Sequence, residues 1–132
     1  MTAGSLDANV ILRMLLNDVP IHHSAALALL SSGDSFAVSD TAMIETIFVL
    51  GRAYGLTREQ QREAVVGVLG QPQISGSLEL FEAAFELYLA HPKLSFEDCY
   101  LVSVADSTGM EPLWTFDRKL ANQTSARLVN TV

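Results

Sequence analysis

The sequence predicts a single α/β domain that covers residues 1–132. Short apolar segments with strand character alternate along the chain with longer helical segments, and an acidic residue directly follows two of the strand segments. Alternation of this kind is typical of parallel βαβ units. Because 49% of the residues are apolar, the chain can also bury a substantial core. We therefore expect a layered α/β fold with a parallel sheet.

The first half of the chain contains mostly helical segments. A lead-in at 4–6 is a candidate strand that ends at Asp7, and the sequence FAVS predicts a strand at 36–39. Glycine or proline punctuates the helical segments. The expected helices are 8–16, 22–32, 41–55 and one that starts at Thr57 and fades at Gly67 and Gly70.

The second half repeats the alternation with shorter strands. A candidate strand at 73–75 precedes the amphipathic helix 78–90, and Pro92 lies just beyond the end of that helix. Another helix is expected from about Phe96 to Ser107. A strand at 112–116, a helical turn at 118–122 and a final strand at 126–130 complete the chain. Ligands of such sheets bind outside the carboxyl ends of the strands, where Asp7 and Asp117 are expected.

Composition argues against a secreted or membrane protein. The N-terminus lacks a basic region before its first apolar run, which argues against a signal peptide. The apolar stretch MIETIFVL is too short to span a bilayer and contains Glu45. Cys99 is the only cysteine, so a disulfide framework is excluded and a reducing cytoplasm is the expected location.

The net charge of −7 argues at first sight against a nucleic-acid partner, because phosphate binding favours a basic surface. Four of the 15 acidic residues, however, are candidate metal ligands, and bound divalent cations would offset their charge. The net charge alone therefore does not decide the partner.

Two candidate ligands, Asp7 and Asp117, directly follow predicted strands. Taken alone, each is better explained as the N-cap of the next helix, since an Asp side chain accepts hydrogen bonds from exposed helix N–H groups. Asn9 is a candidate partner of Asp7. Thr115 lies two residues before Asp117, so its hydroxyl is expected on the same side of the sheet.

The other two candidates, Glu45 and Asp98, lie in the early part of helices. A capping box is a weak explanation of Glu45, because its cap would be Ala42, and the helical period places Glu45 beside an apolar face. Ser95-x-x-Asp98 does fit a loose capping box. Asp98 nevertheless shares a face with Leu101, Val102 and Ala105, whereas the neighbouring Glu97 points away from that face.

Four carboxylates in one cleft would stay ionised together only around cations, and all-oxygen ligands suit Mg²⁺ or Mn²⁺ better than zinc. The chain has no G-x-S-x-G motif and no P-loop, and its histidines lack metal-ligand spacing. A glycosidase-type carboxylate pair remains conceivable. The pattern favours metal-assisted hydrolysis of phosphodiesters.

The ordered segments LDANVILRMLL, VSDTAMIETIFVLGRAYG, FEDCYLVSVADSTG and PLWTFDRKLA resemble a PIN domain, and most closely the VapC-type toxins of type II toxin–antitoxin pairs. The resemblance implies a three-layer α/β/α sandwich around a parallel sheet of about five short strands. It also implies a cytoplasmic endoribonuclease that depends on Mg²⁺ or Mn²⁺, forms a homodimer and binds a small antitoxin protein.

The resemblance assigns the metal and catalytic roles to Asp7, Glu45, Asp98 and Asp117. It gives Thr115 and Asn9 supporting roles. The family more often has Thr or Ser where this chain has Ala8, a difference that removes a hydroxyl beside the site and no ligand. Arg118 and Arg13 are candidate contacts for RNA, although an internal ion pair is an equally good explanation of Arg13.

Two other functions stay open: an RNA-processing PIN nuclease without a toxin role, and a non-catalytic module that holds a basic peptide in the acidic cleft. A receiver domain is disfavoured, because paired acids after the first strand and a Lys after the last are missing.

Overall fold

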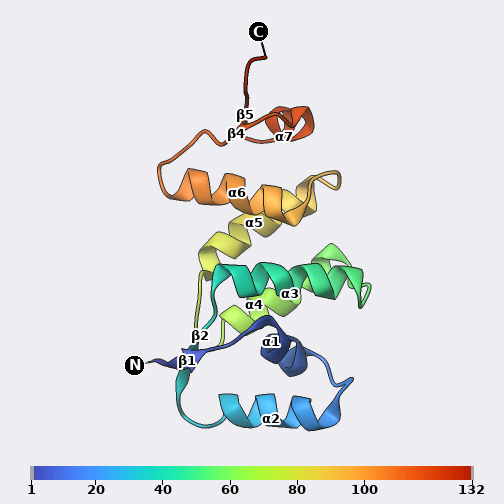
Figure 1. The fold of residues 1–132 in the computed structure, drawn as a ribbon, viewed down its shortest axis with the longest axis vertical. Helices are drawn as coiled ribbons and strands as arrows, with labels where there is room; N and C mark the ends of the chain where they lie inside the picture. Colours follow the sequence, from blue (N-terminus) through green and yellow to red (C-terminus); the bar gives the residue numbers. More distant parts are fainter. Residues whose placement is uncertain (1, 132) are drawn as a thin grey trace. The chain divides into compact units, whose positions relative to one another are not determined.

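The computed structural model describes residues 2–131, which form a mixed α/β fold (Figure 1). The strands are short and all pair in parallel. They are β1 (Thr2–Ser5), β2 (Ser35–Ala37), β3 (Ile74–Ser75), β4 (Trp114–Thr115) and β5 (Arg127–Leu128). The helices of the described residues are α1 (Ala8–Leu15), α2 (Pro20–Leu30), α3 (Asp40–Arg52), α4 (Arg58–Leu69), α5 (Leu78–Ala90), α6 (Phe96–Ser107) and α7 (Arg118–Gln123).

The chain divides into two compact units, and the first ends at Leu78. Its sheet has the order β1-β2-β3, with Phe36 in register with Ile74. The backbone ladder continues past β1, because Leu6 N–H donates to the Ala37 carbonyl at 2.9 Å. Since β1 and β2 are parallel neighbours, the helices that follow them, α1 and α3, begin at the same edge of the sheet.

The core of the first unit forms between its helices and the sheet. Helix α1 packs against both α2 and α3, and α4 packs against α3 and β3. Ile11, Met43, Leu50 and Val65 are fully buried there. Helix α2 begins at Pro20, two residues before the predicted start, because proline at the first helical position costs no hydrogen bond.

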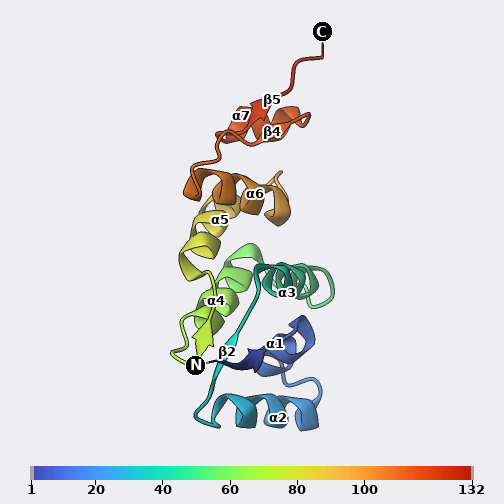
Figure 2. The same cartoon turned by 60° about the vertical axis from the view of Figure 1, so that its left-hand side comes forward.

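The second unit begins at Glu79 and contains α5, α6, α7 and the β4–β5 sheet (Figure 2). Aromatic rings join α5 to α6: the Phe85 and Phe96 ring centroids lie 4.8 Å apart, and those of Phe81 and Phe96 lie 5.8 Å apart. A second cluster joins α6 to α7 and the end of the chain. It consists of Leu94, Cys99, Val102, Leu120 and Ala126, with Leu113 packed against it.

The structure confirms the α/β class and the parallel pairing, and it is consistent with an α/β/α sandwich. It differs in the sheet: the strands of residues 2–131 pair as three and two, where one sheet of about five was expected. The strands near the C-terminus are also shorter than predicted, two residues each in place of 112–116 and 126–130, because only Trp114–Thr115 and Arg127–Leu128 form ladder pairs. In residues 2–131, each helix is too short or too polar to span a bilayer.

Candidate functional site

Asp7 lies at the carboxyl end of β1 and caps α1. Its Oδ1 accepts a hydrogen bond from Val10 N–H at 2.9 Å, as an N-cap side chain does. Its chain neighbours Leu6 and Ala8 are buried, whereas Asp7 itself is exposed. The expected N-cap role is therefore confirmed. Because the cap uses Oδ1, the other carboxylate oxygen is available at the surface for a second role.

Glu45 lies in the second turn of α3, which Ser39 caps through a 3.1 Å bond from Ala42 N–H. A capping role for Glu45 is thereby excluded, as the sequence indicated. The side chain is exposed, and the buried residues of α3 are Met43, Thr46, Ile47 and Leu50. Helices α1 and α3 pack together and start at the same sheet edge, so Asp7 and Glu45 belong to one edge of the first unit.

Asp98 lies in the first turn of α6 and is half-buried. Ser95 caps this helix by accepting from the Asp98 N–H at 3.2 Å, a bond that uses the backbone of Asp98 and not its carboxylate. The next residue, Cys99, is fully buried, while Glu97 is exposed. The structure thus supports the choice of Asp98 over Glu97 as the acid beside the packed face.

Asp117 follows β4 and caps α7. Its Oδ1 accepts from Lys119 N–H at 2.9 Å and from Leu120 N–H at 3.3 Å. Its own N–H donates to Thr115 Oγ1 at 2.9 Å, so Thr115 is held beside it, as predicted from the sequence. Leu120 and Cys99 share one hydrophobic cluster, so Asp117 and Asp98 each lie close in sequence to a residue of the same core.

The four carboxylates offer only oxygen donors, which fits Mg²⁺ or Mn²⁺. Asp98 and Asp117 also occupy the N-terminal ends of helices, where the helix dipole stabilises negative charge. Within each unit, the described residues gather no group of three or more His, Cys, Asp or Glu side chains that could hold a metal ion. The four-carboxylate site therefore stays a prediction.

Arg13 forms an internal network. Its Nη1 donates to Asp18 Oδ1 at 2.6 Å, its Nη2 donates to Tyr54 Oη at 3.1 Å, and Tyr54 Oη donates to Asp18 Oδ2 at 2.6 Å. The Tyr54 hydroxyl, followed by Arg13, lowers the pKa of Asp18. Tyr54, followed by Asp18, raises the pKa of Arg13. The Arg13 side chain is only 15% exposed. This geometry favours the ion-pair interpretation of Arg13 over a contact with RNA.

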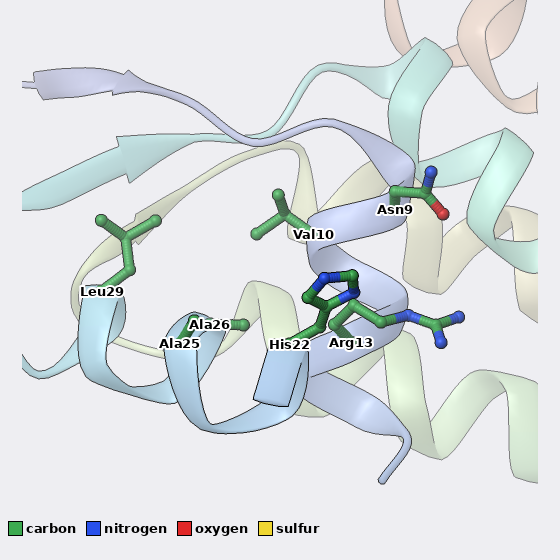
Figure 3. Close-up of a pocket in the computed structure, with 7 residues that line it drawn as sticks. All are labelled: Asn9, Val10, Arg13, His22, Ala25, Ala26 and Leu29. Carbon is green, nitrogen blue, oxygen red and sulfur yellow. The ribbon is translucent and has the colours of Figure 1, made fainter. Parts of the chain in front are cut away.

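A pocket of about 500 Å³ lies between α1 and α2 (Figure 3). Asn9, Arg13 and His22 lie at one end of it, and Leu29 lies at the other. Val10, Ala25 and Ala26 complete the lining. The structure thus places Asn9 at this pocket, and a role for Asn9 in supporting Asp7 stays a prediction.

Arg118 and Lys119 are both exposed, so the predicted RNA contact through Arg118 is sterically accessible. Sequence reasoning missed Tyr54, which contacts Arg13 across 41 positions of the chain, because a contact at that separation has no local pattern. It also missed Arg127, whose guanidinium lies 5.9 Å from the Trp114 ring centroid. The parallel register of Trp114 with Arg127 explains this second contact, and strand pairing is not visible in a single sequence.

The comparison with curated proteins gave no match. The comparison with protein families matched the PIN domain over residues 5–124, a span that includes all four candidate carboxylates. PIN domains are generally nucleases and typically bind a divalent metal. A match over this share of the chain settles the family: the protein belongs to the PIN domain family.

Proposed function

We propose that the protein is a metal-dependent endoribonuclease and the toxin of a type II toxin–antitoxin pair. The observation that carries the proposal is the PIN family match, together with an acid at each of the four positions that the family pattern requires. We assign the metal to Asp7, Asp98, Glu45 and Asp117, with Thr115 positioning Asp117 through the bond to its backbone N–H.

The capping geometry supports this assignment chemically. In both Asp7 and Asp117 the cap bonds fall on Oδ1, so the local fold fixes each carboxylate while the second oxygen stays available. Side chains whose rotamers are fixed by the backbone lose little conformational freedom when they bind a cation. When bound, Mg²⁺ or Mn²⁺ supplies an activated water and neutralises charge on the phosphodiester.

Isosteric Asp→Asn substitutions test the assignment of the metal ligands. Asp7→Asn and Asp98→Asn replace a carboxylate by an amide of the same shape. Asn caps a helix as well as Asp does, which preserves the cap of α1, and the cap of α6 uses only the backbone N–H of Asp98. We expect both purified variants to fold normally and to lose RNA cleavage in Mg²⁺ or Mn²⁺. Glu97→Gln is the matched control, because Glu97 adjoins Asp98 but is exposed. Cleavage at the wild-type rate by both Asn variants would contradict the metal assignment.

The toxin role rests on the resemblance to VapC-type proteins and needs its own test. Expression in a bacterial host without an antitoxin should arrest growth, and co-expression of the cognate antitoxin should restore it. The Asp98→Asn variant should be harmless. Harmless expression of the active protein, with cleavage confined to one RNA, would favour the RNA-processing alternative.

A homodimer is part of the same proposal, since VapC-type relatives pair in this way. Light scattering of the purified chain should report twice the mass of 14.3 kDa. A non-catalytic module that binds a basic peptide is the remaining alternative. Metal-dependent cleavage by the wild-type chain that is lost on Asp7→Asn would exclude it.

A further inference from the structure

Three side chains of the first unit, Arg13, Asp18 and Tyr54, form a closed network of hydrogen bonds. Arg13 lies in the last turn of α1, Asp18 lies in the loop before α2, and Tyr54 follows the end of α3. Each side chain bonds to the other two, at distances of 2.6 Å, 3.1 Å and 2.6 Å. All three precede Leu78, so this arrangement lies wholly within one compact unit. We call these three residues the Arg13 network.

The Arg13 network joins the C-terminal ends of α1 and α3. The backbone of Arg13 is itself fixed, because His23 of α2 donates from Nδ1 to the Arg13 carbonyl at 2.7 Å. The opposite ends of the two helices are joined through the sheet, where Leu6 N–H donates to the Ala37 carbonyl at 2.9 Å. Helices α1 and α3 are therefore held at both ends, by the sheet where they begin and by the network where they end.

The two candidate ligands of this unit lie at different distances from the sheet. Asp7 caps α1 and so lies at the sheet end. Glu45 follows the Ser39 cap of α3 by six residues, which is about 9 Å along a helix. A tilt of α3 about its sheet end by about 6° would therefore move Glu45 by about 1 Å relative to Asp7. A bond to Tyr54 opposes this tilt most effectively, because Tyr54 lies beyond the far end of α3.

Stability alone is a poor explanation of the Arg13 network. A partly exposed ion pair adds little to stability, and the side chains of Arg13 and Asp18 are 15% and 40% exposed. Among residues 2–131, Arg13 Nε is also buried without a hydrogen-bond partner, which costs free energy. The network does specify one geometry, because a planar guanidinium forms its bonds in fixed directions.

We propose that Tyr54 is a positioning residue, which fixes the separation of the Asp7 and Glu45 carboxylates through Arg13 and Asp18. The inference rests on the proposed function, in which both carboxylates bind the metal. Residues that orient metal ligands indirectly typically contribute about 10- to 100-fold to metal affinity. Because Tyr54 acts through the whole of α3, we expect a contribution of about tenfold.

A Mn²⁺ titration of the purified full chain tests the inference. The electron paramagnetic resonance signal of free Mn²⁺ reports metal binding without RNA and without cleavage. Tyr54→Phe removes the hydroxyl and both of its hydrogen bonds but keeps the ring. We expect the Kd for Mn²⁺ to rise about tenfold. Saturating Mn²⁺ should restore RNA cleavage, because the variant lowers the affinity and leaves every ligand in place.

Two further variants make the test specific. Thr57→Ala is the matched control, because it removes the N-cap of α4 in the same unit and leaves the Arg13 network intact. It should lower Tm and leave the Kd for Mn²⁺ unchanged. Arg13→Lys breaks the network from its other side, since one ammonium group cannot reproduce the fork of bonds. It should raise the Kd as much as Tyr54→Phe does, and the double variant should raise it no further, because both changes break one network. Arg13→Lys decides the test if Tyr54→Phe does not fold.

The outcomes separate the inference from the proposed function. An unchanged Kd in Tyr54→Phe, with wild-type binding that Asp7→Asn weakens, would overturn the inference and keep the metal assignment. An equal rise in Kd in Thr57→Ala would also overturn it, because general destabilisation would then explain the effect. A wild-type chain that binds no Mn²⁺, or an Asp7→Asn variant that binds it equally well, would refute the metal assignment and the inference with it.

Discussion

Asp117 combines a structural role with a proposed chemical one, and two substitutions separate them. Asp117→Ala removes both the cap and the carboxylate, whereas Asp117→Asn removes only the charge. The cap accepts two backbone N–H groups at the start of a six-residue helix. That helix contributes Leu120, 2% exposed, to the core cluster, so fraying of its first turn would expose buried surface.

The expected magnitudes follow from these contacts. Replacing an N-cap Asp by Ala costs about 1 kcal/mol, within a range of about 0.5–2 kcal/mol, and for a chain of this length that lowers Tm by roughly 3–5 °C. Asn accepts the same hydrogen bonds, so Asp117→Asn should change Tm by less than about 1 °C. If Asp117 holds the metal, both variants should lose RNA cleavage on the order of 100-fold or more.

The assay pairs thermal unfolding, followed by circular dichroism at 222 nm, with cleavage of a labelled RNA in Mn²⁺. Thr57→Ala is the matched control, because Thr57 caps α4 by accepting from Gln60 N–H at 3.1 Å and is not a candidate ligand. It should lower Tm by a similar amount and leave the cleavage rate of the folded protein unchanged. Full cleavage by Asp117→Asn would refute the ligand role, and a Tm loss equal to that of Asp117→Ala would refute the capping argument.

Three further predictions concern stability. Because the pKa of Asp18 lies below its ordinary value of 3.8 in the folded chain, its network stabilises the protein above that pH and loses this contribution as the pH falls through the lowered pKa. Tyr54→Phe removes the main cause of the shift, so acid titration followed by circular dichroism should show a smaller loss of stability below about pH 4 than in the wild type. Gly51→Ala would place a Cβ 2.8 Å from Gln61 Nε2, which donates to the Leu56 carbonyl at 3.0 Å. Urea unfolding should therefore show a decrease of about 1–2 kcal/mol in the free energy of unfolding. An unchanged midpoint would mean that the Gln61 side chain shifts freely. Phe85→Ala removes a fully buried ring that contacts Phe96 and should cost about 3–5 kcal/mol in the same assay, and a loss below about 1 kcal/mol would contradict the packing.

Local features of the fold were predictable from the sequence because local interactions form them. The N-cap roles of Asp7 and Asp117 and the hydroxyl of Thr115 beside Asp117 involve residues no more than three positions apart. The helices 78–90 and 96–107 were predicted with the bounds that the structure has. Amphipathic periodicity and capping residues define such segments without knowledge of their partners.

Contacts between distant residues were not predictable in the same way. The lengths of β4 and β5 depend on which residues pair, and Arg127 contacts Trp114 only because the two strands align in that register. From the sequence, Arg13 could be interpreted either as an RNA contact or as a member of an ion pair. The structure favours the ion pair, because Asp18 and Tyr54 lie beside Arg13. A side chain's partners across the chain depend on packing, and a single sequence carries no direct record of packing.

The sequence by itself determined the α/β class, most of the helices and the membership of the PIN domain family, because these depend on local patterning and on residue type at set positions. Only the tertiary structure decided that Arg13 is held in an internal network and that the Arg127 guanidinium lies over the Trp114 ring. The physical reason is that charge pairing and exposure are properties of neighbours in space, and folding brings those neighbours together from distant parts of the chain.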